Sequence, residues 1–162
     1  MITSKRIKYV YLLVGIWAFV LFSCVENNVY HHYETIDDSI WNEHIAYRFD
    51  VEITDTLSVY DVFIEIRNNN AYSYENLWLF VSHETPWNDR RKDTLNCRLA
   101  YPDGQWCGKG LSLYSLSVPY EEAVSFPHPG IYSYTLRHGM REEKLKGITD
   151  IGIRVSPRQL LK

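Results

Sequence analysis

Three cysteines and six histidines are the side chains with which this chain could carry out nucleophilic chemistry. A cysteine nucleophile needs a nearby base to hold it as a thiolate, and histidine is the usual base. The available pairs are Cys97 or Cys107 with His128 or His138, and neither cysteine lies in an activating local sequence. The chain also lacks the Gly-x-Ser-x-Gly motif that would present a serine nucleophile. We therefore expect no enzymatic activity.

Metal or cofactor binding would need several ligand side chains close together. His31 and His32 are adjacent on an expected strand, so their side chains point to opposite faces and cannot bind one ion together. His83, His128 and His138 lie on separate segments, and the acidic residues lack the glycine-containing spacing of a calcium loop. No glycine-rich loop precedes a helix. We expect no metal, no cofactor and no small-molecule substrate.

Aromatic rings are the remaining candidates for a contact surface. Trp106 shares one face of an expected strand with Gly108 and Gly110, and glycine leaves the backbone beside the indole bare. Either the ring packs across this bare backbone, or another molecule approaches it there. In the second case Trp78 and Trp87 would be companion rings. A glycan- or peptidoglycan-binding module of the cell envelope would stack sugars on such flat rings, and this is our alternative hypothesis.

Cys24 suggests a different chemistry, because it follows a sequence with the order of a secretory signal. Two lysines and an arginine precede an almost unbroken apolar run over residues 9–22, and Leu21-Phe22-Ser23-Cys24 has the form of a bacterial lipobox. We predict a lipoprotein signal peptide over residues 1–23. Acyl chains such as palmitate would then modify the amine and thiol of Cys24, which is enough for stable anchoring.

An uncleaved signal anchor is the alternative for this segment, because Phe22 stands where a small or β-branched residue is usual. A membrane span needs about 20 apolar residues. The run over 9–22 contains only 14 residues, which favours a cleaved signal.

Cleavage would leave 139 of the 162 residues, a length that suits a single domain. We predict a short polar tether over 24–28 and one domain over 29–162. The signal removes three positive charges and no acidic residue, so 14 Lys and Arg remain against 20 Asp and Glu, a net charge of −6. An acidic chain without a basic cluster is not expected to bind nucleic acid.

Alternating apolar and polar residues predict the strands that position these side chains. The clearest examples are residues 47–54, 60–67, 132–136 and 151–155. Residues 77–81 (LWLFV) are apolar on both faces, which predicts a central strand. We expect Trp41 to fill one end of the core, and one short helix near 140–146. Eight or nine strands with turns between them predict an all-β fold, an antiparallel β-sandwich of immunoglobulin-like or jelly-roll-like outline.

A disulfide between Cys97 and Cys107 depends on the hairpin around Pro102-Asp103-Gly104. If Asp103 and Gly104 form the loop, Cys107 faces Ala100 rather than Cys97. A β-bulge would be needed to bring the two sulfur atoms together. The sequence leaves this bond open.

Two groups of residues resemble the motifs of the GldH gliding-motility lipoproteins of Bacteroidota. The first is Asp93–Ala100 (DTLNCRLA), Asp103-Gly104-Gln105-Trp106 and Gly108-Lys109-Gly110; the second is His138-Gly139-Met140-Arg141 and Leu145–Val155 (LKGITDIGIRV). The lipoprotein signal and Trp41 also fit this family. The resemblance covers most of the chain after the signal, whereas Cys107 does not belong to the family pattern.

The resemblance implies an outer-membrane lipoprotein of the gliding-motility and linked protein-secretion apparatus. It implies contacts with other envelope proteins and no catalysis, although the source cell itself need not glide. Surface-exposed lipoproteins of this phylum resemble one another in an acidic tract after the lipidated cysteine. Only Glu26 occurs there in this chain, so we expect the domain to face the periplasm.

Overall fold

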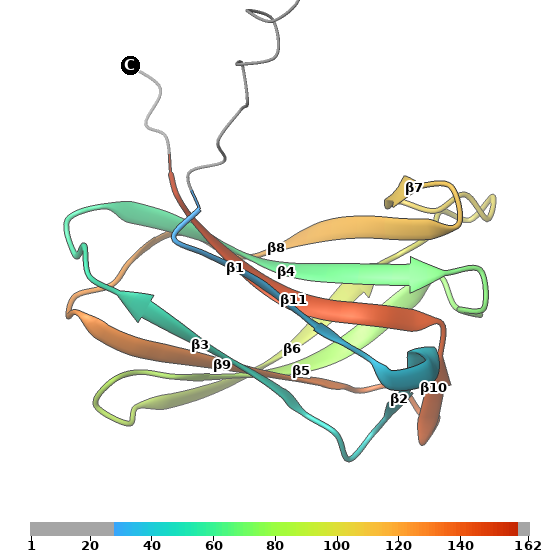
Figure 1. Ribbon diagram of the computed structural model, residues 1–162, viewed down its shortest axis with the longest axis horizontal. Helices are drawn as coiled ribbons and strands as arrows, with labels where there is room; N and C mark the ends of the chain where they lie inside the picture. The colour runs from blue at the N-terminus through green and yellow to red at the C-terminus, as the bar shows by residue number, and fades with distance from the viewer. Residues whose placement is uncertain (1–27, 159–162) are drawn as a thin grey trace, which may run out of the picture.

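The computed structural model describes residues 28–158, so Cys24 and the predicted signal lie outside it. Two antiparallel sheets pack face to face (Figure 1), which confirms the predicted all-β sandwich. One sheet has the strand order β1-β11-β4-β8-β7, the other the order β3-β9-β5-β6, and β10 pairs with β2 at one end. The elements are β1 (Tyr30–Thr35), the 3-10 turn η1 (Asp37–Ser39), β2 (Ile40–Asn42), β3 (Tyr47–Ile53), β4 (Val59–Asn69), β5 (Asn76–Glu84), β6 (Arg90–Arg98), β7 (Lys109–Gly110), β8 (Leu113–Ser125), β9 (Gly130–His138), β10 (Lys144–Lys146) and β11 (Ile148–Pro157).

The core lies between the two sheets and follows directly from the period-two pattern of the strands. The long strands turn alternate apolar side chains inward, where they are buried, except in β8, whose inward side chains are only partly buried. The inward residues include Val62, Ile64 and Ile66 of β4, Ile151, Ile153 and Val155 of β11, Phe49 and Val51 of β3, Leu77 and Leu79 of β5, and Tyr134 and Leu136 of β9. Burying each large aliphatic side chain contributes about 1.5–3 kcal/mol, and this holds the two sheets together.

Trp41 fills one end of this core, as the sequence predicted. The indole is fully buried and donates its N–H to the carbonyl oxygen of Ile45 at 2.9 Å. The ring packs edge-on against Tyr47 and His138, with centroid distances of 5.5 and 5.4 Å. β2 therefore covers the open end of the sandwich with the Trp41 side chain, whose buried N–H is hydrogen-bonded.

The predicted helix near 140–146 is wrong. Residues Lys144–Lys146 form β10, which pairs with β2 so that Leu145 lies opposite Trp41. Leu145 is completely buried, whereas the lysines on both sides are exposed. A two-turn helix gains too little to form by itself, and pairing with a distant strand buries the one apolar side chain available. That partner comes from the other end of the chain, so the local sequence could not show it.

His138 beside Trp41 makes the stability of the fold depend on pH. Its Nε2 lies 3.1 Å from the Trp41 carbonyl oxygen, which can only accept, so Nε2 carries the hydrogen of the neutral ring. Nδ1 is buried and has no hydrogen-bond partner in the described part of the chain. Burial lowers the pKa of His138, because a second proton on Nδ1 would be desolvated and unpaired. Burial also lowers the pKa of His83.

We expect the free energy of unfolding to fall as the pH decreases from about 7.5 to about 5.5, across the ordinary histidine pKa near 6.5. In this window the histidine of the unfolded chain binds a proton more readily than the buried histidine of the folded protein. The contribution of the neutral histidine to stability is therefore present above the pKa of the unfolded chain, and it is lost as the pH falls below that value. Urea midpoints at several pH values measure the effect. His138→Gln should flatten part of the dependence, whereas His44→Gln, at an exposed position, should leave it intact. An unchanged slope in His138→Gln would contradict this account.

Candidate functional site

The outward face of the four-stranded sheet carries the candidate contact surface. β5 lies between β9 and β6, which confirms the predicted central strand. Leu77, Leu79 and Val81 point into the core, so Trp78 and Phe80 point outward, and their side chains are 40% and 41% exposed. The outer side of this apolar strand is therefore only partly covered.

The segment after β9 bonds the backbone of Trp78 and lies against the ring of Phe80. The backbone N–H of Gly139 donates to the Trp78 carbonyl oxygen at 2.7 Å, and Met140 Sδ accepts from the Trp78 N–H at 3.4 Å. A Cβ on Gly139 would lie 3.0 Å from the Phe80 ring, so glycine allows the ring to lie against the backbone. We call Trp78, Phe80, Gly139 and Met140 the aromatic patch. Because the Phe80 ring lies against Gly139, a partner would find this ring already positioned.

Two open depressions flank the aromatic patch. One of about 400 Å³ is lined by Tyr74, Asn76, Trp78, Gly139, Met140 and Arg141. The other, of about 470 Å³, is lined by His44, Ala46, Phe80, Val81, Ser82, Lys92, Asp93, Thr94, Thr135 and Arg137. The patch therefore borders two hollows, which protruding side chains of a partner could fill.

The rim of the patch is basic, although the whole chain has a net charge of −3. Lys92, Arg137 and Arg141 line the two depressions, and the Arg137 guanidinium lies 5.3 Å from the Phe80 ring centroid. Asp93 is the one carboxylate in either lining. It already accepts hydrogen bonds from the Tyr120 hydroxyl at 2.5 Å and from Arg91 at 2.8 Å, which hold its pKa below the usual range. An acidic partner surface would suit this rim.

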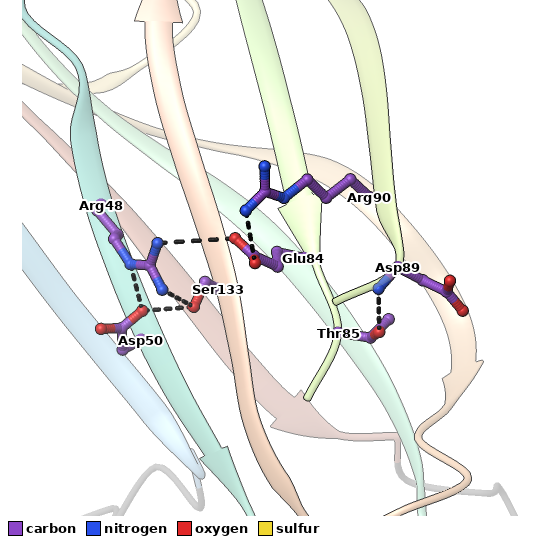
Figure 2. A network of polar contacts seen from close by, with 7 residues as sticks. All are labelled: Arg48, Asp50, Glu84, Thr85, Asp89, Arg90 and Ser133. Carbon is purple, nitrogen blue, oxygen red and sulfur yellow. Dashed lines mark hydrogen bonds and ion pairs between the residues drawn. The ribbon is translucent and has the colours of Figure 1, made fainter. Parts of the chain in front are cut away.

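The other half of the same face is polar and internally paired (Figure 2). Arg48 donates to Asp50 and to the Ser133 hydroxyl, both at 2.8 Å, and lies 3.7 Å from Glu84. Glu84 also pairs with Arg90 at 3.0 Å. The hydrogen bond from Ser133, followed by the Arg48 contacts, lowers the pKa of Asp50. These charged and polar groups are paired with one another. The face therefore has one half of paired polar side chains and one half with exposed aromatic side chains.

The three tryptophans singled out in the sequence lie apart. Trp87 is in the turn between β5 and β6, at the opposite end of the sheet from Trp78. Trp106 packs between Tyr72 and Tyr114, with centroid distances of 6.5 and 5.6 Å, and donates to Asn70. They therefore do not form the shared platform that the glycan-binding hypothesis requires. The sequence prediction missed Phe80, Gly139 and Met140 of the patch. The five consecutive apolar residues over 77–81 could have indicated Phe80, because they predict a second apolar face.

The two cysteines in the described part are both free. Cys97 is fully buried in the core, and burial raises the pKa of its thiol to about 12. The hairpin is shifted by one residue from the expected register: Trp106 rather than Cys107 lies opposite Ala100. The Cys107 N–H donates to the Leu99 carbonyl at 2.8 Å. Cys97 is therefore a core residue and not a nucleophile.

Residues 28–158 contain no group of three or more His, Cys, Asp or Glu side chains that could hold a metal ion. They also contain no helix that is long and apolar enough to cross a membrane. Among these residues the sandwich instead presents the partly exposed Trp78 and Phe80 on the outer face of its four-stranded sheet.

The chain belongs to the GldH lipoprotein family, whose model matches residues 28–155. It is 34% identical over 153 residues to the gliding motility lipoprotein GldH homolog of Christiangramia forsetii, covering 89% of this chain and 93% of the relative. It is 34% identical over 149 residues to the gliding motility lipoprotein GldH of Flavobacterium johnsoniae, covering 87% and 92%. No solved structure matched significantly. The resemblance stated from the motifs is thus confirmed.

The structure divides the motif residues into two roles. Some support the fold, such as the buried Cys97 and Leu99 of the first motif group. The segment His138–Arg141 of the second group does something different, because Gly139 and Met140 belong to the aromatic patch and Arg141 lines a depression beside it. One segment of the family motif therefore builds the candidate contact surface.

Proposed function

We propose that this protein is a lipid-anchored component of the outer membrane that works without catalysis in the gliding-motility and linked secretion apparatus. Its sandwich domain faces the periplasm and binds another envelope protein through the aromatic patch. The relatives named above are gliding motility lipoproteins, and this supports the proposal. The exposed pair Trp78 and Phe80, in the open half of an otherwise satisfied sheet face, is the observation that carries it.

The anchor in this proposal is Cys24, at the end of a cleaved signal over 1–23. The evidence for it is the order of charged, apolar and lipobox residues in the sequence. Residues 24–28 then form the tether and 29–162 the domain.

Replacing Cys24 should abolish lipidation of the protein. The Cys24→Ala variant has no thiol to carry an acyl chain, so it should incorporate no palmitate. Palmitate labelling of whole cells, followed by purification of the protein, measures the effect. Cys107→Ala is the matched control, since Cys107 is also partly accessible but lies inside the domain. Equal labelling of wild type and Cys24→Ala would contradict the lipoprotein assignment.

The patch is tested by the double variant Trp78→Ser/Phe80→Ser. Truncating a tryptophan at the centre of a protein interface typically costs about 2 kcal/mol or more, so the double variant should weaken binding at least about 30-fold. We expect cross-linking in native envelopes, affinity purification and mass spectrometry to recover components of the motility or secretion apparatus with the wild type and to lose them with the variant.

Ile131→Ser is the matched control for this experiment, because Ile131 is an exposed apolar residue at the polar end of the same sheet face. It should keep the partner. Urea unfolding of both variants checks that the domain remains folded. Recovery of the same apparatus proteins with Trp78→Ser/Phe80→Ser, or recovery of none with the wild type, would overturn the proposal.

A further inference from the structure

One end of the sandwich gathers three loops and the start of β1. The loops at 54–58, 85–89 and 126–129 lie together at the left in Figure 1. Pro86 lies against Gly130 at the start of β9, and the ring of Phe126 packs on Tyr60 at 5.4 Å. The N–H of Val29 donates to Val155 at 2.9 Å, so the chain enters the fold in this half of the five-stranded sheet. We call this end the loop end.

Leu57 projects from the loop between β3 and β4 and is 94% exposed. The carboxylate of Asp55 accepts from the Leu57 N–H at 2.8 Å and from the Ser58 hydroxyl at 2.5 Å. The Tyr60 hydroxyl donates to the Asp55 carbonyl at 2.7 Å. This bonding closes the loop on itself, as Asp does in many turns, and leaves a fixed leucine at its tip. Transfer of such a side chain from water into an apolar phase is favourable by about 2 kcal/mol.

Trp87 projects from the next loop at the same end and is 43% exposed. Its indole N–H donates to Asp89 at 2.5 Å, and its ring packs edge-on against His128 at 5.0 Å. The turn is closed by hydrogen bonds between the backbones of Thr85, Asn88 and Asp89. A rigid, half-exposed indole with a polar edge is the type of side chain that is enriched where membrane meets water.

The position of the lipid decides what these residues meet, and this step rests on the proposed lipidation of Cys24. Cys24 is five residues from Val29, so the tether spans at most about 17 Å. Val29 bonds to Val155, which lies opposite Val62 of β4. The loop end begins at Val59, only about 10 Å farther along that strand. Asn69, at the other end of β4, lies about 23 Å from Val62 and beyond the reach of the tether.

We infer that the loop end rests in the headgroup region of the membrane that holds the lipid anchor, with Leu57 and Trp87 inserted. The strands then stand steeply on the bilayer. Trp78 lies six residues before Glu84 on β5, so this orientation holds the aromatic patch about 20 Å from the lipid. The anchor and the two loop residues together orient the patch towards the periplasm, where a protein partner could reach it.

The test uses the full lipidated protein in vesicles of phosphatidylethanolamine and phosphatidylglycerol, with phospholipids brominated high on the acyl chain. Bromine quenches tryptophan fluorescence on contact. We expect quenching in the wild type, loss of most of it in Trp87→Phe, and full retention in Trp78→Phe and Trp106→Phe. In the Trp87→Phe background, Leu57→Trp should restore quenching. The matched change Leu111→Trp should not, because Leu111 is 95% exposed but lies at the opposite end.

Each outcome decides the inference. Quenching that survives Trp87→Phe but disappears in Trp78→Phe means that the other end, or the sheet face, meets the lipid, and it overturns the inference. Restoration by Leu111→Trp as strong as that by Leu57→Trp does the same. Protein that floats with the vesicles and shows no quenching overturns the inference alone, leaving the anchor intact. Protein that does not float at all overturns both the inference and the proposed lipidation.

Discussion

The Arg154→Ala variant is expected to lose about 3–5 kcal/mol of its free energy of unfolding, because it strands a buried carboxylate. Glu65 points to the outer face of the five-stranded sheet, yet the residue is only 3% exposed. Arg154 Nε donates to Glu65 Oε1 at 2.7 Å, and Ser117 and Tyr33 donate to Oε2 at 2.6 and 3.2 Å. The Arg154 guanidinium also covers the Phe63 ring at 4.0 Å. Urea unfolding measures the loss.

Two further variants separate the charge from the packing. Arg154→Met combined with Glu65→Gln keeps the volume and leaves a neutral amide that can still bond Ser117 and Tyr33, so it should recover a large part of the loss. Arg158→Ala removes a surface partner of Asp61, 3.3 Å away, and should cost no more than about 1 kcal/mol. If Arg154→Ala were no more destabilising than Arg158→Ala, the buried pair would not stabilise the sheet.

The Gly147→Ala variant is the second change for which we expect a large loss of stability. Gly147 joins β10 to β11 with φ +91°, and a Cβ there would lie 2.2 Å from the Tyr72 backbone nitrogen. Its N–H donates to Ser39 and its carbonyl accepts from Asn69, both at 2.9 Å, so the segment cannot move without breaking these bonds. The left-handed conformation costs about 1–2 kcal/mol and overpacking another 1–3 kcal/mol, so we expect about 2–5 kcal/mol in total.

Gly104→Ala is the matched control for this change. Gly104 also has a positive φ, +83°, but nothing lies within 4 Å of the added Cβ. This variant should therefore lose only the conformational part, about 1–2 kcal/mol. Urea midpoints of the two variants isolate the steric part as their difference. Equal losses of stability in the two variants would mean that the backbone at Tyr72 moves away from the added Cβ without a loss of free energy.

Individual residues show how far sequence reasoning reached into the fold and the site. Alternation over 60–67 placed Glu65 correctly on the outer side of its strand, yet its burial depends on Tyr33, Arg154 and Ser117 from three other strands. The run 77–81 predicted the central strand correctly, but only the assembled sheets showed that its outer side stays open at Phe80. Met140, assigned to a helix, instead supports Trp78 in the patch.

The sequence by itself determined the all-β class and the family, because strand alternation and motif spacing are local properties that can be read along one chain. It also located Trp41 in the core. The tertiary structure alone decided that β10 pairs with β2, that the three tryptophans lie apart, and that Trp78 and Phe80 form one patch with Gly139 and Met140. These features depend on contacts between residues distant in the chain, where side chains compete for burial, and no local pattern records the outcome of that competition.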